Sequence, residues 1–139
     1  MRTYDVDKVK AAIAQYADQI VGFNPEEWLG NPKNVALINN NHDVALFESQ
    51  ADLFNTVCGH YFFFSRGKEA VKAAQEFLEE VFTETYIETI TGLTPLDNKG
   101  ALWINRRLGF KEYGEVSTVV GPCRFVMMTK DQWKKKANN

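Results

Sequence analysis

The sequence has few of the residues that build metal sites and disulfide frameworks. Its 139 residues include two cysteines, Cys58 and Cys123, and two histidines, His42 and His60. Because the cysteines lie far apart and lack CxxC spacing, we expect both to be reduced in a cytoplasmic protein. Neither histidine has a ligand-type residue three or four positions further on. We therefore expect no metal site.

Long apolar runs and a strong charge of either sign are also missing. No segment approaches the roughly 20 apolar residues that a membrane-spanning helix needs, and the charged first nine residues are unlike a signal peptide. The formal net charge of −2 gives no general attraction to nucleic acid or to an anionic membrane. We interpret the basic residues 134–136 as a solvated tail. The length suits one domain over residues 1–139.

The spacing of apolar residues alternates between helical and extended periods along the chain. Helical stripes and capping residues predict helices at 5–21, 25–29, 68–82 and 98–108, with caps at Asp5, Asn24 and Asn98 and with Ile20 in the first stripe. Short apolar and β-branched runs predict strands at 35–38, 44–47, 56–64, 86–91, 111–119 and 124–128.

We expect residues 39–43, which include Asp43, to form a hairpin turn, Gly92 to end strand 86–91, and Gly121-Pro122 to join the last two strands. We interpret Tyr61 as an ordinary core residue of strand 56–64. A helical crossover joins strand 56–64 to strand 86–91, so these two should be parallel in a mostly antiparallel sheet. The pattern predicts an α+β fold.

The segment Phe62-Phe63-Phe64-Ser65-Arg66-Gly67-Lys68 is the first candidate site. A strand that runs through a glycine into a helix presents unpaired backbone N–H groups and the positive helix end, which favour a phosphate or pyrophosphate. Arg66 and Lys68 would add positive charge. The alternative interpretation is that Gly67 only begins a helix.

Residues 98–110, Asn-Lys-Gly-Ala-Leu-Trp-Ile-Asn-Arg-Arg-Leu-Gly-Phe, resemble the N-x-x-A…K-x-G-F segment of the GNAT superfamily of N-acetyltransferases. The 66–68 junction falls where that family has its pyrophosphate loop, and residues 125–133 resemble its closing strand and tail. The resemblance implies a GNAT-type acyl-CoA N-acyltransferase fold, acetyl-CoA as co-substrate, and direct acetyl transfer to an amine of a small molecule or protein. A small phage-encoded member would fit the length.

The resemblance also implies which residues contact the cofactor. They are Phe62, Phe63, Phe64, Arg66, Gly67, Lys68, Glu69, Ala70, Asn98 and Asn105. Glu69 and Val71 stand where the family usually has small residues, and Asn105 stands where many members carry a tyrosine that acts as general acid. An asparagine amide does not ionise in the working pH range, so it cannot supply that proton. Asn98 has an equally good interpretation as a helix N-cap.

Two residues are candidates for the general base that such a transfer needs, His60 and Glu88. His60 has the more suitable intrinsic pKa, although each residue can also be an ordinary sheet position. A rival hypothesis is a catalytically inactive GNAT-like binding or assembly protein, such as a phage virion or host-interaction protein. The order of elements disfavours a small nucleotide-binding module. The sequence leaves the oligomeric state open, a homodimer included.

Overall fold

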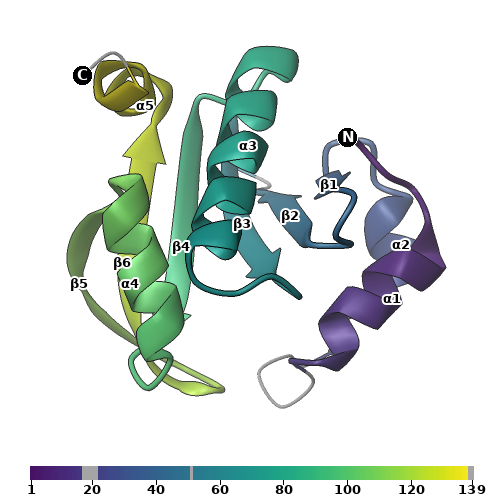
Figure 1. Cartoon of the computed structure of the whole chain (residues 1–139), viewed down its shortest axis with the longest axis horizontal. Helices are drawn as coiled ribbons and strands as arrows, with labels where there is room; N and C mark the ends of the chain where they lie inside the picture. The colour runs from purple at the N-terminus through teal and green to yellow at the C-terminus, as the bar shows by residue number, and fades with distance from the viewer. Residues whose placement is uncertain (17–21, 51, 138–139) are drawn as a thin grey trace.

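The computed structural model describes residues 1–16, 22–50 and 52–137, and these form one mixed sheet with helices on both faces (Figure 1). The order of strands in the sheet is β1-β2-β3-β4-β6-β5. Among the strands that the structure describes, β3 and β4 are the one parallel pair, as the helical crossover predicts. The strand bounds are β1 Val35–Ile38, β2 Val44–Ser49, β3 Thr56–Phe62, β4 Thr89–Pro95, β5 Lys111–Thr118 and β6 Gly121–Thr129.

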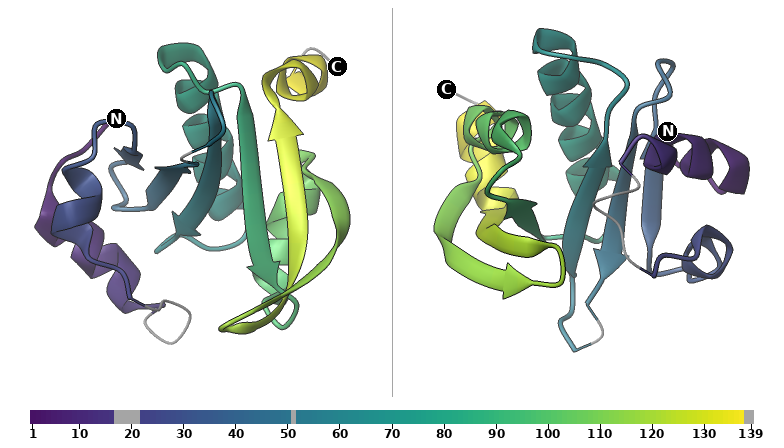
Figure 2. Two further views of the ribbon diagram at one scale, coloured as in Figure 1. Left: turned by 180° about the vertical axis from the view of Figure 1, so that it is seen from behind. Right: turned by 90° about the horizontal axis from the view of Figure 1, so that it is seen from below.

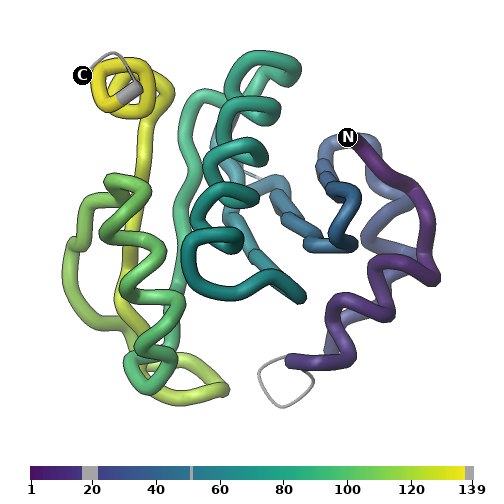
Figure 3. The backbone as a smooth tube through the Cα atoms, viewed as in Figure 1, coloured from purple at the N-terminus to yellow at the C-terminus, as the bar shows by residue number. Residues whose placement is uncertain are grey.

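Two layers of helices cover different parts of this sheet (Figure 2). α3 (Lys68–Glu84) and α4 (Lys99–Leu108) bury the larger core, which includes Phe47 and Phe77. α1 (Val6–Ala14) and α2 (Pro25–Leu29) bury a second cluster against β1, β2 and β3. α1 and α5 (Lys130–Ala137) lie at opposite ends of the sheet (Figure 3). Within the described ranges, no helix is long and apolar enough to cross a membrane.

The helix boundaries follow the capping residues of the sequence. Asp5, Asn24 and Asn98 each accept backbone N–H groups at the start of α1, α2 and α4. α4 ends at Gly109, whose φ of 97° suits a residue without a Cβ. Cys58 and Cys123 are both free, as expected.

Several predicted boundaries are wrong. α1 ends at Ala14, short of residue 21, and residues 17–21, with the predicted stripe residue Ile20, lie outside the described residues. β3 ends at Phe62 and not at residue 64, because the backbone of the next two residues turns into a loop held by Tyr16 and Asp43. β4 covers Thr89–Pro95 and not 86–91, since its whole length pairs with β6.

The end of the chain also differs from the prediction. Gly121 and Pro122 begin β6 and do not form the turn, which lies at residues 119–120. Residues 134–136 are exposed, as predicted for a solvated segment, but they belong to the helix α5 and not to an irregular tail. Trp133 anchors that helix by packing on Phe82, with ring centroids 5.4 Å apart. This aromatic contact packs α5 against α3.

Candidate functional site

The central feature of the sheet is the divergence of β3 from β4. Their parallel pairing covers three residues on each strand and ends at Cys58 and Thr91. Beyond this point β3 continues beside β2 and β4 continues beside β6. The strands therefore enclose a wedge, and in the described strands no ladder joins residues 59–62 to 92–95. Backbone groups facing the wedge are left for a ligand.

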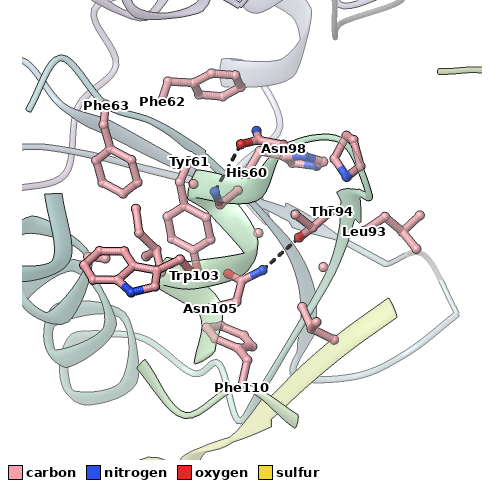
Figure 4. A pocket seen from close by; sticks show the side chains of 18 of the residues that line it. His60, Tyr61, Phe62, Phe63, Leu93, Thr94, Asn98, Trp103, Asn105 and Phe110 are labelled. Carbon is pink, nitrogen blue, oxygen red and sulfur yellow. Dashed lines mark hydrogen bonds between the residues drawn. The ribbon is translucent and has the colours of Figure 1, made fainter. Parts of the chain in front are cut away.

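A cavity of about 780 Å³ fills this wedge and continues toward α4 (Figure 4). This volume suits a ligand of drug size or larger. Two glycines lie where the strands part, and a Cβ built on Gly92 would be 4.0 Å from the carbonyl oxygen of Gly59. Other lining residues come from β3, β4, α4 and the start of α3, among them His60, Tyr61, Phe63, Ala70, Thr94, Asn98, Trp103 and Asn105.

The cavity reaches the N-terminus of α3. Gly67 precedes this helix with a φ of 57°, and within the described residues no side chain caps it. A Cβ at Gly67 would meet nothing within 4 Å, so the backbone is open to a ligand here. Gly67 and Ala70 line the cavity. An uncapped helix start with this access is an anion-binding geometry.

A buried carboxylate braces the loop that leads into α3. Asp43 is 0% exposed and accepts the N–H groups of Phe64 (2.7 Å) and Ser65 (2.9 Å). It also accepts the Ser65 hydroxyl (2.7 Å) and the Asn39 amide (3.0 Å). Burial alone would raise the pKa of Asp43, but these hydrogen bonds outweigh it and hold the pKa below 3.8. Asp43 therefore fixes the loop as an ionised group.

Arg66 lines the cavity and stabilises the same loop. Its Nη1 donates to the carbonyl oxygens of Phe63 (2.7 Å), Ser65 (3.0 Å) and Phe64 (3.3 Å). These bonds orient the loop carbonyls toward the guanidinium. The positive charge of Arg66 thus stays at the mouth of the cavity near the start of α3.

Not every predicted cofactor residue faces the cavity. Seven of them line it: Phe62, Phe63, Arg66, Gly67, Ala70, Asn98 and Asn105. The other three, Phe64, Lys68 and Glu69, do not. Phe64 is 46% exposed. Glu69 borders a separate surface hollow with Asn40 and Lys72, so its carboxylate does not project into the cavity. Val71 is partly buried and packs against the core.

α4 presents two asparagines to the cavity, and each has a hydrogen-bond partner. Asn98 Oδ1 accepts the N–H of Ala101 at 3.1 Å, so Asn98 is an N-cap that also lines the cavity. Asn105 is buried, and its Nδ2 donates to Thr94 Oγ1 at 2.8 Å. Figure 4 shows this bond joining α4 to β4. The amide of Asn105 is thus held by the protein itself.

The α1–α2 face of the sheet carries a polar cluster around His60. His60 Nε2 lies 3.8 Å from Glu48 Oε1, and Trp28 Nε1 donates to Glu48 Oε2 at 3.2 Å. His60 chiefly lowers the pKa of Glu48, against the effect of burial. Burial favours the neutral imidazole, but Cys58 and Glu48 outweigh it and raise the pKa of His60 above 6.5. His60 therefore carries a positive charge at neutral pH.

Glu88 lies away from this cluster. It is an exposed residue just before β4, at the end of the strand where β3 and β4 are still paired. Its N–H donates to Asn55 O at 2.9 Å, and its carbonyl oxygen accepts Lys130 N at 2.8 Å. The structure does not bring Glu88 to the cavity or to His60.

Sequence reasoning missed two residues of this region, Asp43 and Glu48. Asp43 was interpreted only as part of a hairpin turn, because its partners are 21 and 22 residues further along the chain. Glu48 is a carboxylate at the end of β2 opposite β3, and pairing of the two strands brings it to His60. The segment between β2 and β3 is short, so the register of an antiparallel pairing between these strands would have placed Glu48 near His60.

Comparisons with known proteins agree on the fold. No protein-family model matches the sequence, and a search of curated proteins found no match either. Among solved structures, a mutant of the spermidine N-acetyltransferase SpeG from Vibrio cholerae has a TM-score of 0.77 at 9% identity, covering 99% of this chain and 98% of that one. An uncharacterised protein from Bacillus halodurans has a TM-score of 0.73 at 12% identity, covering 98% and 85%.

A third similar structure contains a ligand. It is the aminoglycoside acetyltransferase AAC(6')-Ib in complex with coenzyme A, with a TM-score of 0.70 at 14% identity, covering 99% of this chain and 96% of that one. A GNAT-family acetyltransferase from Bacillus anthracis is similar at a TM-score of 0.61 and 15% identity, covering 91% and 86%. This chain is similar to these structures over a six-stranded sheet in which one parallel pair of strands diverges. This chain therefore has the fold of the GNAT acetyltransferases.

Proposed function

We propose that this protein is an acyl-CoA-dependent N-acyltransferase that moves an acetyl group from acetyl-CoA to an amine of a small molecule or protein. The observation that supports it most is the cavity that runs from the divergence of β3 and β4 to the uncapped start of α3. We place the protein in the cytoplasm, where acetyl-CoA is available. The likeness to acetyltransferases of known fold supports the general chemistry.

The residues present fit an acyl-CoA. The open backbone at Gly67, with Arg66 beside it, suits the diphosphate. The edge of β3 over residues 59–62 does not pair with β4, so it suits an extended, amide-bearing arm that would bind as an added strand. When bound, acetyl-CoA would supply an activated thioester.

The protein contributes position and electrostatics to the transfer. Backbone N–H groups of β3 that face the wedge would polarise the acyl carbonyl, and the walls of the cavity would align the amine with it. His60 lines the cavity on the α1–α2 face, and we propose it as the base that takes the amine proton. Because the pKa of His60 is raised to about 9, this role requires alkaline pH, at which the imidazole is neutral and can accept a proton.

One observation favours the rival hypothesis of an inactive binding protein. Asn105 is hydrogen-bonded to Thr94 and cannot act as an acid, so α4 supplies no proton to a leaving group. An inactive protein with this fold would bind CoA, or a related ligand, without turnover. Binding and turnover therefore have to be measured separately.

The test begins with calorimetric titration of acetyl-CoA into the wild-type protein and into Gly67→Asp. The carboxylate of Gly67→Asp would stand where the diphosphate binds, and we expect affinity to fall by about 100-fold. Gly67→Ala is the matched control, because it carries the same backbone strain at a φ of 57° without the charge. Absence of wild-type binding at millimolar acetyl-CoA would reject the proposed function.

Turnover is measured as release of the CoA thiol with a panel of amines. The panel contains spermidine and an aminoglycoside, the compounds named for similar structures, and peptides with free amino groups. Release that depends on the amine, with a matching acetylated product by mass spectrometry, supports the enzyme. Tight binding without turnover of any amine supports the inactive protein.

A further inference from the structure

Large apolar side chains are exposed around one side of the cavity. Among the described residues, four exposed large apolar residues line it, and three of these, Leu93, Val119 and Val120, come from outside α4. Leu93 belongs to β4, and the two valines form the turn between β5 and β6. Val119 is 88% exposed and Leu93 44%. Exposed apolar residues that gather at one cavity, in contrast to scattered ones, indicate where the apolar part of a ligand binds.

Strand alternation shows which face of the sheet this apolar side belongs to. Cys58 pairs with Thr91, the last pair between β3 and β4. Side chains two residues apart point to the same face of a strand, so Leu93 shares a face with His60 and Phe62. Phe62 packs in the core cluster that α1 and α2 cover. The apolar side of the cavity is therefore on the face opposite α3 and α4.

The two faces suit the two substrates of the proposed transfer. The backbone groups at Gly67 and Ala70, which suit the diphosphate of the donor, lie at the start of α3. An acceptor amine would then reach the acyl group from the other face, where His60, Phe62 and Leu93 line the cavity (Figure 4). The side chains of that face therefore determine which amine can enter.

The charges at the cavity distinguish between classes of amine. No aspartate or glutamate is among the described residues that line it. Arg66 and His60 line it, and both are positively charged at neutral pH. The Glu48 carboxylate beside His60 is outside the lining and accepts Trp28 Nε1. A polycation would gain no ion pair from these lining residues and would meet two like charges, which disfavours its binding.

We propose that the acceptor is a small primary amine with a single positive charge and an adjacent apolar group, such as an arylalkylamine, and not a polyamine. This inference rests on the proposed function. The apolar group would lie against Leu93, Val119 and Val120, with the nitrogen beside His60. Three side chains match one aromatic or aliphatic group and not the length of a peptide. Spermidine and aminoglycosides, which are named for similar structures, carry several amino groups, so we expect them to be poor substrates here.

The test compares two amines as acceptors for the wild-type protein with acetyl-CoA. Release of the CoA thiol is followed with 2-phenylethylamine, a monoamine with an aromatic ring, and with spermidine. We expect kcat/KM to be at least about 10-fold higher for 2-phenylethylamine, because apolar contacts of one ring change kcat/KM by this order. 2-Methoxyethylamine, which has the same charge without the ring, is the control amine. Its kcat/KM should be about 10-fold lower than that of 2-phenylethylamine.

Val119→Asp tests the apolar side of the cavity directly. Val119 is exposed in a turn, so the melting temperature should stay the same. The variant should raise KM for 2-phenylethylamine by about 10-fold and lower KM for spermidine, while the affinity for acetyl-CoA stays the same. Val116→Asp is the matched control, because Val116 is a 42% exposed valine on β5 outside the cavity. It should change none of these quantities.

A direct binding measurement does not depend on the rate of transfer. Ligand-observed NMR detects 2-phenylethylamine bound to the protein saturated with CoA. We expect binding to the wild type and to Val116→Asp, and binding about 10-fold weaker to Val119→Asp. The same experiment with spermidine should show weaker binding to the wild type than to Val119→Asp.

The outcomes are distinct. A kcat/KM for spermidine equal to or above that for 2-phenylethylamine would overturn this inference and leave the proposed function standing. A preference for a peptide with an apolar first residue over 2-phenylethylamine would overturn the assignment to small molecules. Equal effects of Val119→Asp and Val116→Asp would show that the β5–β6 turn does not contact the acceptor and would also overturn it. A wild-type protein that binds no acetyl-CoA would overturn the proposed function and this inference together.

Discussion

The two ends of the cavity are built from different groups. At the α3 end the groups that face the ligand are mainly backbone, at Gly67 and Ala70, and the ionised carboxylate of Asp43 supports the loop from beneath. On the α1–α2 face the groups are side chains, with His60 beside Glu48 and Trp28. One end is set by the path of the chain, and the other by the identity of its residues.

This difference explains what each end can recognise. A backbone N–H group is the same in every sequence, so an anion site built from N–H groups does not depend on which side chains the loop carries. A cluster of imidazole, carboxylate and indole is particular to one chain, and it is here that the amine acceptor would be selected. Variants at the two ends should therefore change different measurements.

The largest effect is expected from Asp43→Ala. Removing the carboxylate leaves the N–H groups of Phe64 and Ser65 buried without partners, which should lower the free energy of unfolding by about 3 kcal/mol. Affinity for CoA should fall as well, because the loop before α3 loses its support. Urea unfolding and calorimetry measure the two effects.

The lowered pKa of Asp43 predicts how this loss of stability depends on pH. The pKa of Asp43 is lowered by folding, so its contribution to stability is present above pH 3.8 and is lost as the pH falls below that value. The difference between the wild type and Asp43→Ala should shrink in the same range. Asp7→Ala, an exposed acid in the first turn of α1, is the control and should cost well under 1 kcal/mol. Equal stability of both variants would show that Asp43 does not brace the loop.

The same comparison shows how far sequence reasoning reaches. The order of elements from α1 to β6, the parallel pair and the caps at Asp5, Asn24 and Asn98 are local or periodic features, and they were predicted correctly, whereas α5 was not predicted. The start of β4 was not, because Gly92 was interpreted as a terminator. It lies inside the strand, where a Cβ would approach Val126 to 3.1 Å.

The candidate site also has features that the sequence predicts and features that it does not. The uncapped start of α3 was predicted from a strand, a glycine and a helix in succession. Asp43 and Glu48 act through partners that only the fold brings near. Tyr61 was interpreted as an ordinary core residue, and the packing of its ring against Phe47 and Phe63 agrees with this interpretation.

A smaller effect is expected from Glu48→Gln on the other end of the cavity. The glutamine keeps an oxygen for Trp28 Nε1 but removes the charge that helps to raise the pKa of His60. The pKa of His60 should fall, and the pH at which acetyl transfer reaches half its maximum should fall by about one unit. The affinity for CoA should not change. Rate–pH profiles and calorimetry measure these two quantities.

The controls for this variant separate charge from position. Glu79→Gln removes an exposed charge on α3 away from His60 and should leave the profile where it is. His60→Gln should abolish the titration altogether. A profile of His60→Gln that still matches the wild type would rule out His60 as the base, and the acceptor end would then need another proton acceptor.

The smallest effect is expected where the two ends meet. Tyr16, at the end of α1, donates its hydroxyl to Phe63 O at 3.1 Å, and Arg66 Nη1 donates to the same oxygen at 2.7 Å. Tyr16→Phe leaves that carbonyl oxygen with one donor, so it should lower the free energy of unfolding by only about 0.5–1 kcal/mol. Tyr4→Phe, on an exposed ring, should cost less still. In Arg66→Ala, Tyr16 is the remaining donor to this carbonyl oxygen. In a double-mutant cycle, Tyr16→Phe should therefore lower the free energy of unfolding by about 1 kcal/mol more in Arg66→Ala than in the wild type. Additive effects would show that α1 and the loop before α3 are independent, and that the two ends of the cavity do not communicate through Phe63.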